Sequence, residues 1–220
     1  METIAVIDFE TTGMAGAGGG RATEIAAVLV RDGRIVDQYA SLMHSGAWVP
    51  PFIERLTGIS NAMLADAPPA GQVMREVAAF TAGCPLVAHN ASFDRSFWLA
   101  ELGLADALPD TAPEFACTVL LARRLYPEAP NCKLGTLAEH FDLPRAGRAH
   151  RALADAFVTA HLLVRMQRDL ERRYADALGD APAGHGLLAR LQHAKRTHLE
   201  ACVKDHARQW QRTRQLALLP

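Results

Sequence analysis

Two carboxylates interrupt an apolar run at the start of the chain, and they constrain the fold more than any other feature. Residues 4–9 are apolar except for Asp8, and Glu10 follows directly. A run of this kind is typical of a strand buried inside a sheet. Because residues i and i+2 of a strand point to the same face, Asp8 and Glu10 lie side by side. Two unpaired charges in that position are costly, so we expect a cation to meet them.

The order of the remaining elements indicates an α/β protein whose mixed sheet is flanked by helices. We expect strands at residues 2–9, 24–31 and 34–43, and the last two are joined by the hairpin signal Asp32-Gly33. The sheet therefore starts antiparallel. Prolines 50, 51, 68 and 69 mark a looped region. Two short strands are expected later in the chain, at residues 86–88 and 115–117. Helices are expected at residues 71–82, 118–125, 134–140 and 151–173, and a further helix is expected to start at Asn90 or Ser92.

Charge is distributed unevenly along the chain of 220 residues. Residues 1–180 carry 16 Lys/Arg against 22 Asp/Glu, a net charge of −6, whereas residues 181–220 carry 7 against 2, a net charge of +5. We expect a domain at residues 1–175, a linker at 176–186 and a basic, amphipathic helical tail at 187–220. Such a tail suits contact with nucleic acid or an acidic partner, although a charged helix more often simply faces water.

The cysteines and the apolar segments indicate a cytoplasmic protein. Cys84, Cys117, Cys132 and Cys202 lack the spacing of a zinc site, so we expect isolated, reduced thiols. No apolar run approaches the roughly 20 residues needed to cross a bilayer, and the N-terminus shows no signal-peptide pattern. Secretion and membrane insertion are therefore not expected.

Two further acids are candidates for the same site as Asp8 and Glu10. Asp94 ends the segment His-Asn-Ala-Ser-Phe-Asp, and Asp155 lies in a helix whose apolar residues imply packing on the sheet. Singly, Asp94 could be a first-turn residue favoured by the helix dipole, and Asp155 a solvated position. If all four converge, they can hold two divalent ions about 3.5 to 4 Å apart, an arrangement used for displacement at phosphorus. Oxygen ligands favour Mg²⁺ or Mn²⁺ over zinc.

His150 precedes Asp155 by five residues. In one continuous helix the two side chains would lie about 140° apart, so they meet only if His150 belongs to the preceding loop. Gly147 makes such a loop plausible. An imidazole can accept a proton from water at neutral pH, which makes His150 a candidate base. His89, by contrast, is expected to satisfy a hydrogen bond at the end of a strand.

These motifs resemble the His-type branch of the DEDD superfamily of 3′-to-5′ exonucleases, which includes the exonuclease domain of the DNA polymerase III epsilon subunit. The resemblance covers about residues 3–168. The Tyr-type branch places tyrosine four residues before the last aspartate, where this chain has Arg151. The matching segments are Asp8–Gly13, Glu24–Val28, Leu56–Ser60, Ala88–Asp94 and His150–Asp155.

The resemblance implies an RNase H-like fold and a metal-dependent nuclease that releases nucleoside 5′-monophosphates from 3′ ends, most naturally of DNA, in proofreading or repair. It also implies roles for single residues. The backbone around Thr11 and Thr12 meets the terminal 3′-hydroxyl, and Phe93 packs near the terminal nucleotide, although an aromatic residue on a helix is as often part of the core. The direct metal ligands are Asp8, Glu10 and Asp155, with Asp94 holding the second ion partly through water and His150 acting as general base.

Two alternatives remain open. One is an exoribonuclease similar to ribonuclease T or oligoribonuclease, because the choice of sugar depends on contacts to the 2′ position. The other is a binding subunit of a polymerase or clamp assembly that acts through its tail. Gln215–Pro220 resembles the short peptide with which bacterial replication proteins dock on the sliding clamp, but it ends in Leu219 and not in an aromatic residue. The complete set of five catalytic residues argues against an inactive enzyme, and we expect single-stranded DNA as the preferred substrate.

Overall fold

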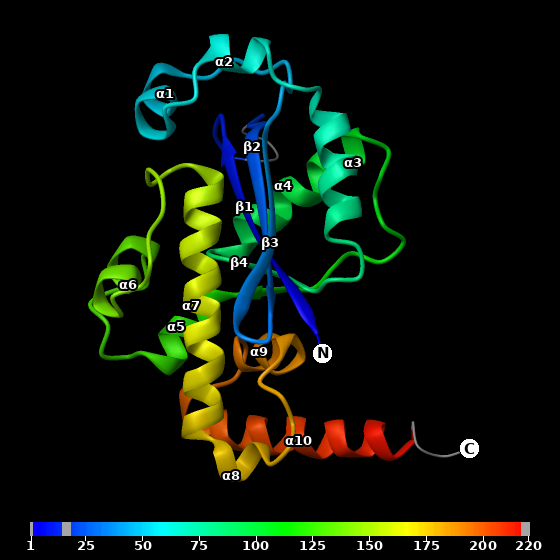
Figure 1. Cartoon of the computed structure of the whole chain (residues 1–220), viewed down its shortest axis with the longest axis vertical. Coiled ribbons are helices and arrows are strands. Elements are labelled where there is room, and N and C mark those ends of the chain that lie inside the picture. Colours follow the sequence, from blue (N-terminus) through cyan, green and yellow to red (C-terminus); the bar gives the residue numbers. More distant parts are fainter. Residues whose placement is uncertain (1, 15–18, 217–220) are drawn as a thin grey trace.

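The computed structural model describes residues 2–14 and 19–216. The prediction for the peptide Gln215–Pro220 therefore lies partly outside the described residues. The centre of the fold is one sheet with the strand order β3-β2-β1-β4-β5 (Figure 1). Its strands are β1 (Thr3–Thr11), β2 (Ala22–Arg31), β3 (Arg34–Leu42), β4 (Leu86–Ala88) and β5 (Phe115–Cys117).

The sheet is mixed, as predicted. β1 pairs antiparallel with β2 and parallel with β4, and β5 continues the sheet parallel to β4. β2 and β3 form the predicted hairpin, in which Asp32 and Gly33 have φ angles of 53° and 69°. Positive φ at both turn residues is the geometry that follows the right-handed twist of the strands, and glycine is the residue that adopts it most readily.

Both faces of β1 are buried, and the alternation along this strand decides which layer each side chain meets. Ile4 and Val6 belong to the core formed with α5, α6 and α7, whereas Ala5 and Ile7 belong to the core formed with α3 and α4. Asp8 and Glu10 continue the row of Ile4 and Val6, so they face the α7 layer. The helices are α3 (Ala70–Phe80), α4 (Ala91–Leu104), α5 (Thr118–Leu125), α6 (Leu134–His140) and α7 (Ala152–Arg173).

The region between residues 50 and 69 was expected to be a loop, and this was wrong. It contains α1 (Pro51–Thr57) and α2 (Asn61–Ala65), which lie beyond the end of β1 and β2 in Figure 1. Pro51 stands in the first turn of α1, where the missing N–H costs nothing. Ser60 caps α2 by accepting a hydrogen bond from the backbone N–H of Met63. The prolines therefore mark where helices begin.

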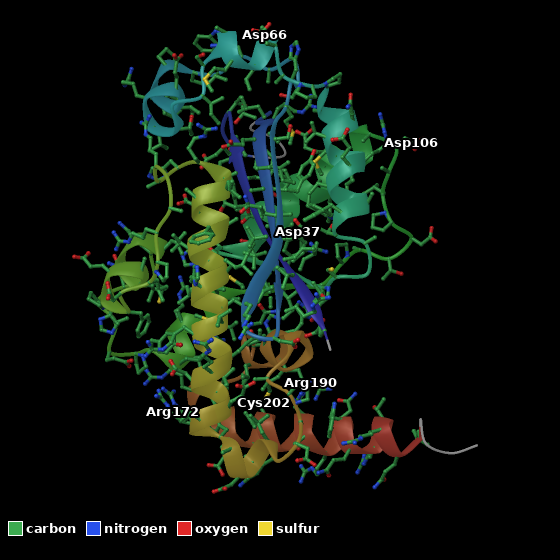
Figure 2. All side chains as sticks on the ribbon, in the orientation of Figure 1. Asp37, Asp66, Asp106, Arg172, Arg190 and Cys202 are labelled. Atoms are coloured by element: carbon green, nitrogen blue, oxygen red, sulfur yellow. The ribbon has the colours of Figure 1, made fainter. Side chains whose placement is uncertain are left out.

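The chain after α7 packs on the rest of the fold. Its elements are α8 (Ala175–Leu178), α9 (His185–Leu191), a 3₁₀ turn at Arg196–His198 and α10 (Leu199–Leu216). Leu178, Ala181 and Ala183 are buried in the same core as α7. Figure 1 shows α9 and α10 at the end of the sheet opposite α1 and α2, and the labelled Arg190 and Cys202 mark this end in Figure 2.

The cysteines and the helices agree with two further expectations. Cys84, Cys117, Cys132 and Cys202 are all free thiols. Within the described part of the chain, no helix is both long enough and apolar enough to span a membrane.

Candidate active site

The end of β1 supplies two carboxylates at a point where its neighbour β4 has already stopped pairing. β4 pairs with Ala5 and Val6 of β1. Farther along β1, the first turn of α4 takes over, because Oδ1 of Asp94 accepts a hydrogen bond of 3.1 Å from the backbone N–H of Phe9. Asp94 is only 2% exposed. The hydrogen bond holds this third carboxylate beside Asp8, whose charge it repels.

The start of α7 supplies the fourth carboxylate and the histidine. α7 begins at Ala152, so Asp155 lies in its first turn and His150 lies in the preceding loop, where its φ angle is 61°. The backbone N–H of His150 donates a hydrogen bond of 3.1 Å to Oδ2 of Asp155. One ligand atom from each of Glu10, His150 and Asp155 lies within 4.8 Å of the other two. The loop therefore brings His150 and Asp155 together as the sequence argument required.

Glu24 fixes this loop from the neighbouring strand. Glu24 lies opposite Glu10 in the β1–β2 pairing and is 5% exposed. Its carboxylate accepts hydrogen bonds of 2.7 and 3.0 Å from the guanidinium of Arg151 and one of 3.0 Å from the backbone N–H of Ala152. The buried carboxylate of Glu24 thus caps α7 and anchors Arg151, the residue next to His150.

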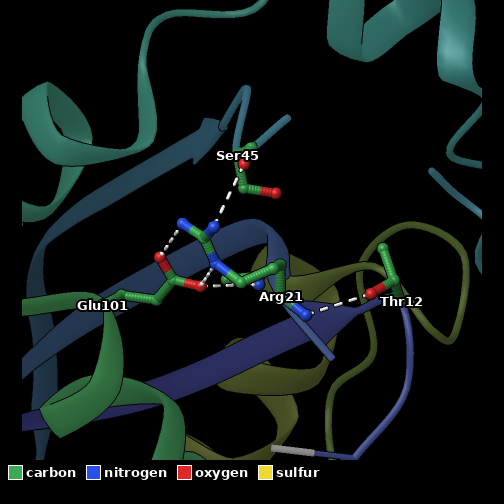
Figure 3. Close-up of polar contacts among 5 residues, drawn as sticks. Thr12, Arg21, Ser45 and Glu101 are labelled. Carbon is green, nitrogen blue, oxygen red and sulfur yellow. Dashed lines mark hydrogen bonds and ion pairs between the residues drawn. The ribbon is translucent and has the colours of Figure 1, made fainter. Parts of the chain in front are cut away.

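A second ion pair lies where β2 begins, next to the end of β1 (Figure 3). Arg21 donates to both carboxylate oxygens of Glu101 at 2.9 Å and to the carbonyl of Ser45 at 3.2 Å. The backbone N–H of Arg21 donates to Oγ1 of Thr12 at 3.0 Å, and the backbone N–H of Thr12 donates to the carbonyl of Arg21 at 2.9 Å. These bonds tie Thr12 to Arg21 at the end of β1, the strand that carries Asp8 and Glu10.

Burial raises the pKa of all four acids. Desolvation, followed by repulsion from Asp94 and Asp155, raises the pKa of Asp8 well above its ordinary value. Desolvation raises the pKa of Glu10 to about 8 and the pKa of Asp94 to about 7. The pKa of Asp155 is also raised by desolvation, against the opposing effect of His150. Four carboxylates in these surroundings are stable in the charged form when cations neutralise them, and an all-oxygen set suits a hard divalent ion.

Phe93 lies at the margin of the site. It precedes Asp94 and packs against Phe97 of the α3–α4 core, with ring centroids 5.0 Å apart. Its side chain remains partly exposed, whereas Phe97 is fully buried. The contact with the core is therefore established, and the contact of Phe93 with a substrate stays a prediction.

A pocket of about 950 Å³ opens beside His150 and Asp155. His89 and Asn90 line it from the end of β4, and the loop before α7 closes another side. Nδ1 of His89 lies 2.8 Å from Oγ1 of Thr118, and burial lowers the pKa of His89 to about 4. This neutral, hydrogen-bonded histidine confirms the expected role at a strand end.

Comparisons with known proteins agree with this geometry. The family model described as "Exonuclease" matches residues 5–163, a range that includes all four acids and the histidine. The DNA polymerase III subunit epsilon of Aquifex aeolicus is 32% identical over 178 residues, which are 81% of this chain and 86% of that protein. The PolC-type DNA polymerase III of Halalkalibacterium halodurans is 39% identical, and there the match covers 80% of this chain but only 12% of the relative. This chain thus spans only a small part of the length of that relative.

Solved structures show the same architecture. Exonuclease X in complex with 5′ overhanging duplex DNA superimposes with a TM-score of 0.60 at 34% identity, over 75% of this chain and 91% of that one. The nuclease domain of 3′hExo, a DEDDh family member bound to rAMP, has a TM-score of 0.64 at 24% identity, over 76% of this chain and 92% of that one, and supports the fold alone. The predicted RNase H-like exonuclease fold is confirmed, and the chain belongs to the exonuclease family.

Proposed function

We propose that this protein is a metal-dependent 3′-to-5′ exonuclease that acts on DNA in proofreading or repair and releases nucleoside 5′-monophosphates. The observation that carries the proposal is the convergence of Glu10, His150 and Asp155 within 4.8 Å, with Asp8 and Asp94 close enough to repel each other. A scattered set of surface acids would not have pKa values raised by burial and by one another. Membership of the exonuclease family, and relatives named as polymerase III subunits, support the same activity.

The four carboxylates are the proposed ligands of two Mg²⁺ or Mn²⁺ ions. Asp8, Glu10 and Asp155 are assigned to direct binding, and Asp94 to the second ion, partly through water. Such ions supply positive charge to the phosphate and promote ionisation of the attacking water. Because the pKa values of Asp8 and Glu10 are raised, these carboxyls release protons when cations bind.

The remaining residues position the substrate and move a proton. His150 is exposed and lies beside Glu10 and Asp155, so its imidazole can accept the proton of the attacking water and pass it to solvent. The backbone around Thr11 and Thr12, fixed by Arg21, is assigned to the terminal 3′-hydroxyl. Phe93 is assigned to the terminal nucleotide through the part of its ring that is not covered by the core.

Digestion of matched 5′-labelled single-stranded DNA and RNA oligonucleotides tests this function. The wild-type protein with Mg²⁺ or Mn²⁺ is expected to shorten DNA from the 3′ end, and EDTA or the change Asp8→Ala is expected to stop it. A preference for RNA would favour the exoribonuclease alternative. Failure to shorten either polymer, or turnover by Asp8→Ala equal to that of the wild type, would overturn the proposal.

The proposed partners include a sliding clamp or polymerase subunit, and the proposed place of action is the cytoplasm. The peptide Gln215–Pro220 supports the clamp by its sequence alone, since residues 217–220 lie outside the described part of the chain. Apolar residues in a short peptide suit a groove on a partner. Deleting residues 215–220 should abolish clamp binding and leave turnover of a free oligonucleotide unchanged, and clamp binding by the deleted protein would refute the idea.

A further inference from the structure

A second depression adjoins the pocket of the active site. It measures about 570 Å³ and lies between the start of α4, α5 and the residues that follow α9. The two depressions share Asn90, Val119 and Arg123 as lining residues. Because three residues line both depressions, the two are adjacent, and we take them together as one surface that runs from His150 and Asp155 to His193. We name it the basic groove, after the cations that line it: Arg95, Arg123, Lys133 and Arg145.

The charge of the basic groove is available to a ligand. All four cations are exposed, and among the described residues none of them forms an ion pair. Away from the active site, the acids that line the groove are Glu114 and Glu139. The groove therefore carries more positive than negative charge, although residues 1–180 as a whole are acidic. A concave surface with excess cations beside a phosphodiesterase site suits a phosphate backbone.

The chain after α9 forms one wall of this groove, because it is anchored to the sheet. Gln192 is buried and its side-chain amide accepts a hydrogen bond of 2.8 Å from the N–H of Cys117 and donates one of 3.1 Å to the carbonyl of Phe115. Arg124 of α5 donates a hydrogen bond of 2.7 Å to the carbonyl of Ala194. His193, between these two anchors, is thereby fixed at the groove. The exposed cations Lys195 and Arg196 follow directly.

We propose that the basic groove binds the phosphate backbone of the strand being shortened, on the 5′ side of the scissile bond, and that the chain after α9 extends this binding surface through Lys195 and Arg196. The proposal rests on the proposed exonuclease function, because the 3′ end then occupies the carboxylate site and the rest of the strand must leave it. Arg123 lies where the two depressions meet, so the strand crosses it in passing from one to the other. Contacts to phosphates alone make this binding independent of base sequence.

Substrate length is the variable that tests the basic groove. A dinucleotide reaches the carboxylate site but leaves most of the groove empty, whereas a single strand of about 16 nucleotides fills it. For Arg123→Ala, the ratio of kcat/KM for the long DNA to kcat/KM for the dinucleotide is expected to fall about tenfold. The double variant Lys195→Ala/Arg196→Ala is expected to lower the same ratio. Arg34→Ala removes an exposed arginine at the start of β3, outside both depressions, and serves as the matched control.

A binding measurement separates this proposal from the exonuclease proposal. Fluorescence anisotropy of a labelled oligonucleotide in EDTA measures binding without turnover, and each lost phosphate contact should lower the slope of log K against log salt by about 0.7. If the wild type cleaves no substrate, the exonuclease proposal fails, and the anisotropy of Arg123→Ala still decides the groove. An unchanged length ratio and salt slope in Arg123→Ala would overturn the groove. If Arg123→Ala lowers the length ratio and the double variant Lys195→Ala/Arg196→Ala does not, the role assigned to the C-terminal chain is overturned.

Discussion

Removing the carboxylate of Glu24 should damage both the stability and the catalysis of the protein, although Glu24 is not one of the proposed metal ligands. In Glu24→Ala, the buried N–H of Ala152 loses its acceptor, which costs about 1–3 kcal/mol. Arg151 also loses two charge-assisted hydrogen bonds, but its side chain is 36% exposed, so water replaces part of the loss. Together, these two losses lower the free energy of unfolding by about 3 kcal/mol, which is at the lower end of what breaking a buried ion pair costs.

For a protein of this length, 3 kcal/mol corresponds to a fall in Tm of about 6–12 °C, which differential scanning calorimetry measures. The catalytic effect follows from position. Arg151 adjoins His150, and a displacement of about 1 Å in a catalytic group can cost roughly 10²-fold in rate. We therefore expect kcat of Glu24→Ala to fall by about that factor, with a smaller change in KM, when both proteins are assayed well below their Tm.

Three controls make this prediction decisive. Glu24→Gln keeps an acceptor for Ala152 and should lose less of both Tm and kcat. The double change Glu24→Ala/Arg151→Ala should cost less than the sum of the single changes, because the two residues form one interaction. Glu76→Ala removes a fully exposed carboxylate that bonds Tyr39 and Gln72, and should leave Tm and kcat unchanged. A folded Glu24→Ala protein with the kcat of the wild type would refute the positioning role of this ion pair.

Three further predictions concern the carboxylate site and its surroundings. Asp8→Ala should remove nearly all oligonucleotide turnover, and His150→Ala should lose roughly 10²-fold or more in kcat, as measured by product release under saturating Mg²⁺. The folded-state pKa of Glu10, about 8, exceeds its ordinary value of 4.5, so this group stabilises the metal-free fold below pH 4.5 and loses that contribution as pH rises toward 8. In EDTA, Tm should therefore fall between pH 5 and 8 more in the wild type than in Glu10→Gln, and Mg²⁺ should restore it; equal pH dependence of the two proteins would contradict this. Arg21→Ala should leave the buried carboxylate of Glu101 without its ion pair and lower Tm by several degrees. The KM of this variant for DNA should also rise, because the backbone at the end of β1 loosens. A KM like that of the wild type would count against this role of Arg21.

The sequence predicted those parts of the fold that depend on local signals. The apolar run of β1, the Asp32-Gly33 turn and the long apolar stripe of α7 each contain their own pattern, and the structure has all three. Asp8 and Glu10 were found because acids inside an apolar strand conflict with burial, whereas Asp94 and Asp155 were assigned to the site only as members of the motif set that resembles the exonuclease family. Helix geometry required His150 to lie outside α7 if it was to meet Asp155, and the structure places it there.

Contacts between distant residues could not be predicted in the same way. Arg151 and Glu24 are 127 residues apart, and Arg21 and Glu101 are 80 apart, so no periodicity connects them. α1 was missed because Pro51 reads as a helix breaker in sequence, whereas in the first turn it favours the helix. The packing of α9 depends on the side chain of Gln192, a residue with no sequence pattern of its own. The proposed division of the chain at residue 175 remains a prediction.

Gln192 has a consequence for the association of this protein with copies of itself. β5 is the last strand of the sheet, and an uncovered edge strand is a template for pairing with a strand of another molecule. The amide of Gln192 occupies the N–H of Cys117 and the carbonyl of Phe115, as a neighbouring strand would. The C-terminal chain thus blocks strand addition at this edge, and a protein truncated before α9 would expose a site for aggregation.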